Sequence, residues 1–511
     1  MDKKYVVGID SGTQSTRVII FDTRGQKVCM GTAAHPPLIA EKAGYAVHDY
    51  DDLWNGLCHA CDDLFSKFKG DVHEIAAIGL SGQRGTTFFV GEDNRQLCRP
   101  ISWMDLRWRE NADHLPPSTE EMDPWCDYLR NYSRMNWMKT NSPELAGKIH
   151  KYLTAPGYMG YQLFGGYVDT LANNLGMPVD REHWELYKDD EVFEKMGLKR
   201  SQLARFVEPG QVMGHVIAEA AALTGFPEGC PVVACAGDKQ CEVLGSGSIS
   251  DGQAYITLGT LSGLDIVGEK YIPDAYKKLK HRTYLASVPG TWHAEAAISK
   301  GFWLVSWFRD NLAEGLDAKA EKLGMTIEAY LDREAESIPA GSEGLVTIPD
   351  WKSNWDKPAA KGMFIGFDHR HKRAHMFRSL IEGIVMQLKV STDEMCSIIG
   401  KSIAELRVGG GGSKSATAVQ AIADVFNIPV KKSVETETCS LGCAICAAVG
   451  AGIFSDFQQA VEAMGQQTKT YTPIAEHHAV YQKLMDRVFS QCYTINEDLL
   501  KEIAEITAYP F

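Results

Sequence analysis

The sequence predicts an α/β protein made of two similar domains on either side of a central cleft. An apolar strand pattern at 5–9 runs directly into a small, hydroxyl-rich turn at 11–15, and a second strand pattern follows at 18–21. The same order returns at 254–263, where Ala-Tyr-Ile-Thr-Leu is followed by Gly-Thr-Leu-Ser-Gly. One strand-and-turn unit therefore opens each half of the chain. Two such units that hold a nucleotide from both sides are typical of the actin-like ATPase, or ribonuclease H-like, fold.

Length and composition agree with two domains, which we expect at 1–245 and 246–511. The 511 residues exceed what one core usually holds, and 44% of them are hydrophobic, enough to fill two cores. A net charge of −14 without a long basic run argues against nucleic acid or a membrane surface as partner. The sequence has no targeting pattern and no apolar run of bilayer length, which predicts a cytoplasmic protein with a small soluble substrate.

The thirteen cysteines predict reduced, mostly buried thiols and not a disulfide framework. Two pairs have Cys-x-x-Cys spacing, at 58/61 and 443/446, but each lies in an apolar helical pattern. Structural zinc sites usually take four ligands from one short module, so we do not expect zinc there. The His-rich stretch 368–375 is predicted to be a solvated loop that enters a helix.

Further strands and helices follow from the spacing of apolar residues. The segment 103–136 is polar, rich in tryptophan and weakly periodic, and we interpret it as an insertion on the substrate side. The segment 477–506 is predicted to be amphipathic, with a buried face made of Val480, Leu484, Val488 and Phe489. Other strands are predicted at 75–81 and 231–236, and helices at 51–68, 302–312, 374–395 and 416–426.

The first turn offers both phosphate donors and a metal-holding carboxylate. Asp10 would be repelled by phosphate, but it can hold Mg²⁺ through water. The N–H and hydroxyl donors come from Gly12, Thr13 and Ser15. An ordinary Asp-Ser-Gly hairpin turn is the alternative for this stretch alone. The second turn, with Gly259-Thr260, favours the phosphate interpretation, whereas the P-loop and G-x-G-x-x-G patterns are absent.

A further glycine run at 409–412 follows a short strand and precedes a helix that begins near Ser415. Because glycines have no side chains, the backbone there can approach a flat purine, and amides at a helix start favour an anion. A flexible linker is the alternative, but no other polar spacer separates the strand from the helix. We therefore predict nucleotide contacts from Gly410, Gly411 and Ser413.

Asp238 follows the buried strand pattern 231–236 and is the candidate general base. A sugar hydroxyl is a weak nucleophile, and a carboxylate at the strand end can accept its proton while the γ-phosphoryl group of ATP is transferred in line. A helix cap is the alternative role for this aspartate, and it is compatible with catalysis.

Taken together, these motifs resemble those of the FGGY carbohydrate kinases, which include xylulokinase, gluconokinase, glycerol kinase and bacterial autoinducer kinases. The segment 10–17 is similar to the family's first phosphate motif, 259–260 to its second and 409–413 to its adenosine motif. Gly237-Asp238 is similar to its catalytic aspartate motif, and 437–444 to a late helix start. The resemblance spans nearly the whole chain and implies ATP and Mg²⁺ as cofactors, and it suggests a homodimer. It also implies roles for Arg17 on phosphate and for Asp10 and Asp238 on the metal.

Substrate residues match the family less closely. The pair Gln83-Arg84 is similar to glycerol kinases, but Gly85 stands where those enzymes have glutamate. Trp103 and Asp105 match an aromatic-then-polar substrate strand, in which the ring covers sugar carbons and the carboxylate accepts hydroxyl donors. Lys239 stands where glycerol kinases have glutamine. The expected substrate contacts are thus Gln83, Arg84, Trp103, Asp105 and Lys239.

The resulting hypothesis is a kinase that transfers the γ-phosphate of ATP to a hydroxyl of a small sugar, ketose or polyol. Candidate substrates are xylulose or ribulose, erythritol or glycerol, an aldonate, or an autoinducer signal. Lys239 and Arg84 offer charged donors that suit a carboxylate or a dense hydroxyl array, although Lys239 can also be read as a surface lysine. The competing classes are a sugar or nucleotide sensor and an ATPase with a protein client. The presence of Asp10 and Asp238 argues against a sensor.

Overall fold

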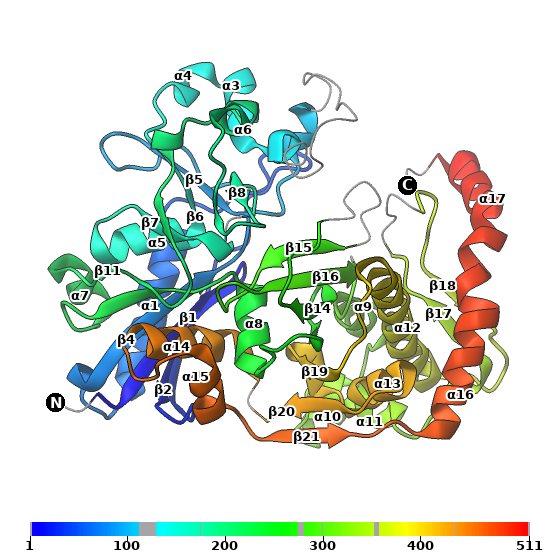
Figure 1. Cartoon of the computed structure of the whole chain (residues 1–511). Coiled ribbons are helices and arrows are strands. Elements are labelled where there is room, and N and C mark those ends of the chain that lie inside the picture. The colour runs from blue at the N-terminus through cyan, green and yellow to red at the C-terminus, as the bar shows by residue number, and fades with distance from the viewer. Residues whose placement is uncertain are drawn as a thin grey trace.

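The computed structural model describes residues 3–111, 129–173, 175–273, 281–298, 300–351, 357–434 and 436–508. Two large sheets dominate it, one in each half of the chain (Figure 1). The amino-terminal sheet has six strands in the order β11-β12-β4-β1-β2-β3. Their bounds are β1 Tyr5–Ser11, β2 Ser15–Asp22, β3 Lys27–Ala34, β4 Ile75–Gly82, β11 Val212–His215 and β12 Pro231–Ala234.

The carboxy-terminal sheet has seven strands in the order β15-β16-β14-β13-β19-β20-β21. Their bounds are β13 Gln253–Leu258, β14 Ser262–Gly268, β15 Arg282–Leu285, β16 Trp292–Ile298, β19 Glu405–Gly409, β20 Val430–Ser433 and β21 Thr468–Tyr471. The predicted strands thus exist, although β12 stops at Ala234, two residues before the predicted end.

The two sheets share one pattern of strand pairing. β1 pairs antiparallel with β2 and parallel with β4, and β13 pairs antiparallel with β14 and parallel with β19. The pattern continues outward, because β4 is parallel to β12 as β19 is parallel to β20. This repetition confirms the predicted pair of actin-like α/β domains.

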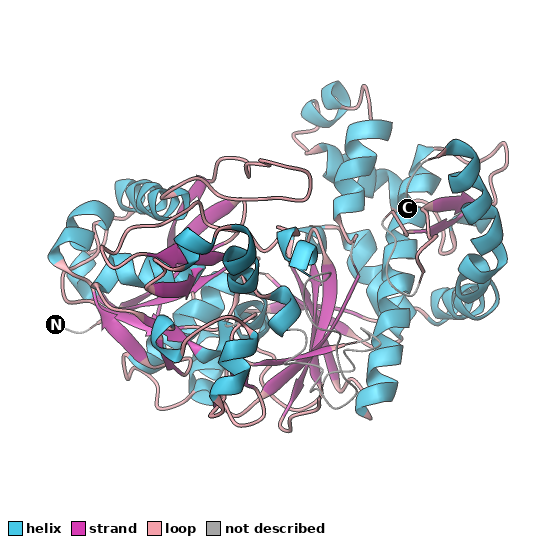
Figure 2. Ribbon diagram, turned by 90° about the horizontal axis from the view of Figure 1, so that it is seen from above, coloured by secondary structure: helices cyan, strands magenta, loops and turns pink. Residues whose placement is uncertain are grey.

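Helices cover both faces of each sheet (Figure 2). One face of the amino-terminal sheet packs on α1 Asp52–Lys67, α5 Ala155–Phe164 and α7 Ala218–Thr224. One face of the carboxy-terminal sheet packs on α9 Trp303–Leu312, α12 Arg373–Ile399 and α13 Ala416–Phe426. The helices predicted at 51–68, 302–312, 374–395 and 416–426 are therefore confirmed, with small shifts at their ends.

Two helices lie between the sheets, α8 Asp238–Ser246 and α14 Thr438–Gly450 (Figure 1). Although α14 comes late in the chain, it packs against β1 and β4 of the amino-terminal sheet. Glycines allow this close approach: a Cβ on Gly8 would lie 1.9 Å from the carbonyl oxygen of Ser440, and one on Gly79 would lie 2.0 Å from that of Cys443. Only glycine fits at these contacts, since no side chain can occupy that space.

Smaller elements surround the two sheets. A group in the amino-terminal half comprises β5 Thr87–Val90, α3 Arg134–Asn141, α4 Pro143–Ala146, β6 Lys151–Thr154, β8 Val179–Asp180, β9 Glu185–Leu186 and α6 Asp190–Lys195, and its helices α3, α4 and α6 lie at the top of Figure 1. The predicted insertion 103–136 belongs partly to it, and its residues 112–128 lie outside the described residues. The other elements are β7 Val168–Thr170, β10 Arg205–Val207, α10 Asp317–Glu321, α11 Ile327–Ala335, β17 Val346–Ile348, β18 Met363–Ile365 and α15 Phe457–Met464.

The carboxy-terminal segment is helical, but its predicted buried face is wrong in part. It forms α16 Ala475–Leu484, a π-helical turn at 485–489 and α17 Ser490–Thr507. Val480 is 38% exposed, whereas Tyr481 is fully buried. The reason is a polar contact with α12, where the Tyr481 hydroxyl donates to Glu382 at 2.8 Å and orients the tyrosine inward.

The cysteine and histidine segments lie where the sequence predicts. Cys58 and Cys61 are on α1, Cys443 and Cys446 are on α14, and each cysteine among the described residues is a free thiol. The stretch 368–375 is a loop that enters α12 at Arg373. Across the part of the chain that the structure describes, no helix is both long enough and apolar enough to cross a membrane.

Candidate functional site

The two predicted phosphate turns face one large cavity. Its volume is about 1160 Å³, and its wall includes Gln14 from the first turn and Gly259 and Thr260 from the second. The fold therefore brings together two segments that are about 245 positions apart in sequence. The cavity wall also contains residues that the sequence reasoning missed, namely Phe302, Trp303, Ser306, Asp332 and Lys414.

The glycine segment closes one side of this cavity. Gly410 has a φ of +79°, and a Cβ there would lie 3.0 Å from the backbone of Leu258, so this position requires glycine. Gly411 and Gly412 line the cavity, and a Cβ on Gly411 would meet open space. The Ser413 hydroxyl instead donates to the Gly410 carbonyl at 2.7 Å, and the residue is buried. Ser413 thus holds the shape of the turn.

Asp10 lies near the end of β1 in an environment that disfavours its charge. Burial raises the pKa of Asp10 to about 7, and the negative charge of Asp238 adds to this shift. Arg17 opposes it, with a nitrogen 3.4 Å from an Asp10 oxygen, and the same guanidinium lies 3.4 Å from Glu437. Asp10 and Asp238, from two different elements, are therefore close enough to influence each other.

Thr13 connects the first turn to two predicted substrate residues. Its hydroxyl accepts a hydrogen bond from the Trp103 indole at 2.8 Å and donates to the side-chain Oε1 of Gln83 at 3.2 Å. Gln83 is buried and also accepts from Thr86 and contacts the His48 ring. Gln83 therefore holds the predicted phosphate turn in place, while Trp103 remains 37% exposed and leaves part of its ring for a ligand.

Asp238 is the first residue of α8, directly after the Gly237 cap. Burial raises the pKa of Asp238, and the positive charges of Arg84 and Lys239 oppose this effect. Its carboxylate accepts the Lys239 backbone N–H at 2.9 Å, as a residue at a helix start can do. Its side chain is still 27% exposed, so one side of the carboxylate is open to a ligand.

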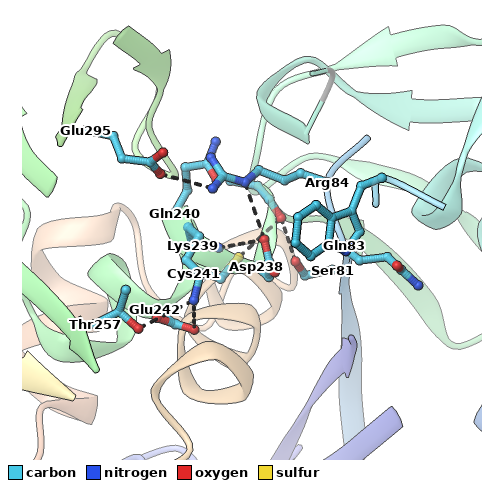
Figure 3. Close-up of polar contacts among 12 residues, drawn as sticks. Ser81, Gln83, Arg84, Asp238, Lys239, Gln240, Cys241, Glu242, Thr257 and Glu295 are labelled. Atoms are coloured by element: carbon cyan, nitrogen blue, oxygen red, sulfur yellow. Dashed lines mark hydrogen bonds and ion pairs between the residues drawn. The ribbon is translucent and has the colours of Figure 1, made fainter. Parts of the chain in front are cut away.

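Arg84 joins the two halves of the chain beside Asp238 (Figure 3). The loop after β4 carries it, and its guanidinium donates to Glu295 of β16 at 3.0 Å. Its Nε lies 3.5 Å from Asp238, and its planar group covers the ring of Tyr284 at 4.7 Å. Glu295 and Tyr284 were not predicted, because they lie on strands with no motif near them in the sequence.

Lys239 points toward the carboxy-terminal sheet (Figure 3). Its ammonium group lies 2.8 Å from Glu242 and 3.4 Å from the Thr257 hydroxyl. Burial lowers the pKa of Lys239, but the negative charges of Glu242 and Asp238 outweigh this effect and raise it. Lys239 is therefore a paired cation next to the base candidate and not a surface lysine.

Asp105 is not placed like the other predicted substrate residues. It is fully buried, and its carboxylate accepts from the Arg107 side chain at 2.8 and 2.9 Å and from the Ala46 N–H at 2.7 Å. These partners occupy the Asp105 oxygens that were expected to accept hydrogen bonds from hydroxyl groups of the substrate. The described contacts support a role in holding the Trp103 segment in place.

Comparison with known protein families gives one result for both halves of the chain. A model of the amino-terminal domain of the FGGY family of carbohydrate kinases matches residues 5–245, and one of the carboxy-terminal domain of the same family matches residues 254–451. The chain belongs to the FGGY family of carbohydrate kinases. It is accordingly a phosphotransferase that uses ATP to phosphorylate a sugar or a related small molecule.

Individual relatives of this FGGY kinase cover almost its full length. An uncharacterized sugar kinase of Escherichia coli K12, YgcE, is 33% identical over 508 residues, which is 99% of this chain and 96% of the relative. The xylulose kinase of Bacillus subtilis is 28% identical and covers 97% of this chain and 98% of its own. The gluconate kinase structure from Lactobacillus acidophilus has a TM-score of 0.81 at 22% identity, with 97% and 98% of the two chains covered, and shares the fold.

Proposed function

We propose that this FGGY kinase transfers the γ-phosphate of ATP to a hydroxyl of a small sugar, ketose or polyol, with Asp238 as the general base. The observation that carries the proposal is the position of Asp238. Its carboxylate lies at the junction of the two halves, between the Asp10 turn on one side and the Arg84–Glu295 contact on the other. A substrate hydroxyl held there would face the γ-phosphate of a nucleotide bound between the two turns.

The residues support a simple order of events. A substrate hydroxyl donates its proton to the Asp238 carboxylate as its oxygen attacks the γ-phosphorus, and ADP leaves with the bridging oxygen. The raised pKa of Asp238 makes it a stronger base than an exposed aspartate. Thr13, Ser15, Arg17 and Thr260 would hold phosphate oxygens, and Gly411 and Gly412 would border the adenosine.

The carboxylates near Asp238 fit a magnesium ion. The described residues contain no group of three or more His, Cys, Asp or Glu side chains that could hold a metal ion, so we propose contact through water. Asp10 and Asp238 would hold the ion. Glu242 lies close enough to raise the pKa of both, and its Oε2 is a buried oxygen without a hydrogen-bond partner in the described structure. The ion would neutralise charge on the transferring phosphoryl group.

The experiment that tests this function is ADP release in the presence of Mg²⁺ and ATP, across xylulose, ribulose, erythritol, glycerol, aldonates and linear diketone-type signals. We expect one compound to stimulate release strongly. ATP binding with no stimulation by any compound would contradict the proposal and favour the sensor alternative. A cytoplasmic location remains a prediction of the sequence, and a homodimer remains what the resemblance to the family suggests.

Asp10 should make the metal-free protein sensitive to pH. Its folded-state pKa of about 7 lies above the ordinary 3.8. The stability that protonated Asp10 allows is therefore lost progressively as the pH rises from the ordinary pKa through the folded-state pKa of about 7, because the buried carboxylate must then carry its charge. Asp10→Asn should therefore raise the Tm of the metal-free protein at pH 8 by about 2 °C or more, and by less at pH 5.5. Differential scanning calorimetry in the presence of a chelator measures the Tm at both pH values. The exposed Asp62→Asn serves as control, and an equal gain at both pH values would contradict the assignment.

Gly411 should control nucleotide affinity. It lines the large cavity, and a Cβ at this position would meet no other atom of the described structure. Gly411→Val places a branched side chain in the space proposed for adenosine. We expect the Kd for ADP to rise about tenfold or more, with little change in Tm. Titration calorimetry measures the affinity, and Gly411→Ala should give a smaller effect. Unchanged ADP affinity in the valine variant would place the adenosine elsewhere.

A further inference from the structure

Two buried histidines lie next to the first predicted phosphate turn. His48 is 1% exposed and His35 is 8% exposed, and the centres of their rings are 6.2 Å apart. The backbone N–H of His35 donates to the Gln14 carbonyl of the turn at 2.8 Å, and that of His48 donates to the Pro100 carbonyl at 3.0 Å. The backbone therefore fixes both histidines close to the turn.

Gln83 connects the His48 ring to this turn. Its Nε2 lies 3.2 Å from His48 Nε2 and 3.4 Å from the Gly12 carbonyl oxygen. Its Oε1 accepts from the Thr13 hydroxyl at 3.2 Å and from the Thr86 hydroxyl at 3.0 Å. One buried carboxamide thus contacts the turn at two positions and His48 at a third.

Trp103 depends on the same carboxamide. Its indole donates to the Thr13 hydroxyl at 2.8 Å, and its backbone N–H donates to the Thr86 hydroxyl at 3.2 Å. Both hydroxyls in turn donate to Gln83 Oε1. A rotation of the Gln83 side chain would therefore loosen the turn and the Trp103 ring together.

The Gly12 contact determines which way the carboxamide faces. A backbone carbonyl oxygen only accepts, so the Gln83 atom beside it is the nitrogen. The same nitrogen faces His48 Nε2, which must therefore accept a hydrogen bond and carry no proton. The proton of the neutral ring is then on His48 Nδ1, which is buried and has no hydrogen-bond partner among the described residues. The contact with Gln83 therefore requires a neutral imidazole.

Protonation of His48 would break this contact. An imidazolium donates from both nitrogens, so its Nε2–H would point at the Gln83 amide group. Burial lowers the pKa of His48 below the ordinary 6.5, although the negative charge of Asp52 on α1 opposes the shift. Burial and the nearby His48 also lower the pKa of His35, to about 4, so His35 stays neutral above pH 5.

We propose that His48 is a positioning residue for phosphoryl transfer. Its neutral ring accepts a hydrogen bond from Gln83 and thereby holds the first turn and Trp103 in the geometry that binds nucleotide and substrate. His48 acts through Gln83 and not by touching a ligand. This inference rests on the proposed function, in which the first turn holds phosphate oxygens.

His48→Phe and His48→Gln test the contact. Phenylalanine keeps a ring but has no acceptor, whereas the glutamine Oε1 can still accept from Gln83. We expect the Kd for ADP with Mg²⁺ at pH 7.5, measured by titration calorimetry, to rise about tenfold in His48→Phe. In His48→Gln it should stay within about twofold of the parent value. His59→Gln, on the exposed side of α1, controls for the removal of a histidine and should leave the Kd unchanged.

The pH dependence separates positioning from simple packing. As the pH falls from 7.5 to 5, the parent should lose about twofold or more affinity for ADP beyond the change in His48→Gln, because only neutral His48 holds Gln83. Glutamine does not titrate in this range, and Asp10, Asp52 and Asp238 are present in both proteins, so the comparison isolates the imidazole. This comparison also decides the inference if His48→Phe does not fold.

Thr13→Val distinguishes a failure of the inference from a failure of the proposed function. A higher Kd for ADP in Thr13→Val, with an unchanged Kd in His48→Phe, would support phosphate binding by the turn and overturn the inference. An unchanged Kd in both variants would contradict the proposed role of the turn and overturn the inference with it. Equal pH dependence in the parent and in His48→Gln would also overturn it. The expected differences in Kd, without ADP release by any compound, would support the inference and contradict the proposed transfer to those compounds.

Discussion

Asp238→Asn should lower the rate of ADP release by about 10²- to 10⁴-fold, the range that a positioned general base contributes. Asparagine has nearly the same shape as aspartate, but its amide cannot accept the proton of the substrate hydroxyl. Among the described residues, the carboxylate accepts the Lys239 N–H of α8, a contact that the asparagine oxygen can also make. We therefore expect nucleotide and substrate affinity to change little while turnover is lost.

The measurement is single-turnover phosphoryl transfer at saturating ATP, together with calorimetric Kd values for ADP and the substrate. Asp62→Asn, on the exposed side of α1, controls for the general effect of losing one carboxylate. In the parent protein the rate should fall as the pH drops through the raised pKa of Asp238, because the protonated acid cannot act as base. If Asp238→Asn keeps its turnover, another group is the base.

Gly442→Ala should destabilise the protein by about 3 kcal/mol or more, the largest effect on stability that we predict. Gly442 lies on α14 where that helix crosses α8, and a Cβ there would lie 2.0 Å from the Cys241 carbonyl oxygen and 2.8 Å from its carbon. The obstacle is backbone, so no side chain can rotate away to make room. The two helices would have to separate, and buried contacts on both sheets would be lost.

The Tm of Gly442→Ala, measured by calorimetry, reports this loss. Gly147→Ala is the control, because a Cβ at Gly147 would lie 3.6 Å from its nearest neighbours, an ordinary contact distance. Since Asp238 is the first residue of α8, the folded fraction of Gly442→Ala should also show reduced turnover. A Tm equal to that of the parent protein would show that the helix crossing can relax without cost.

Much of the fold and part of the site follow from local sequence patterns. The turns after β1 and β13 can be predicted because a strand and its following turn are short, contiguous and rich in small residues. Asp238 is predictable for the same reason, since it directly follows a buried strand. The roles of Asp105 and Ser413 could not be predicted, because hydrogen bonds to Arg107 and to the Gly410 carbonyl determine where their polar atoms point.

The sequence by itself determined the duplicated α/β architecture, the two turns after β1 and β13 and the base candidate, because each depends on neighbouring residues. Only the tertiary structure decided what surrounds them. It brings Glu295 from β16 to Arg84 from the β4 loop, and it places α14 on the amino-terminal sheet through Gly8. These contacts join segments up to several hundred residues apart. The packing of whole sheets and helices determines which distant segments meet. A local pattern in the sequence therefore cannot predict these contacts.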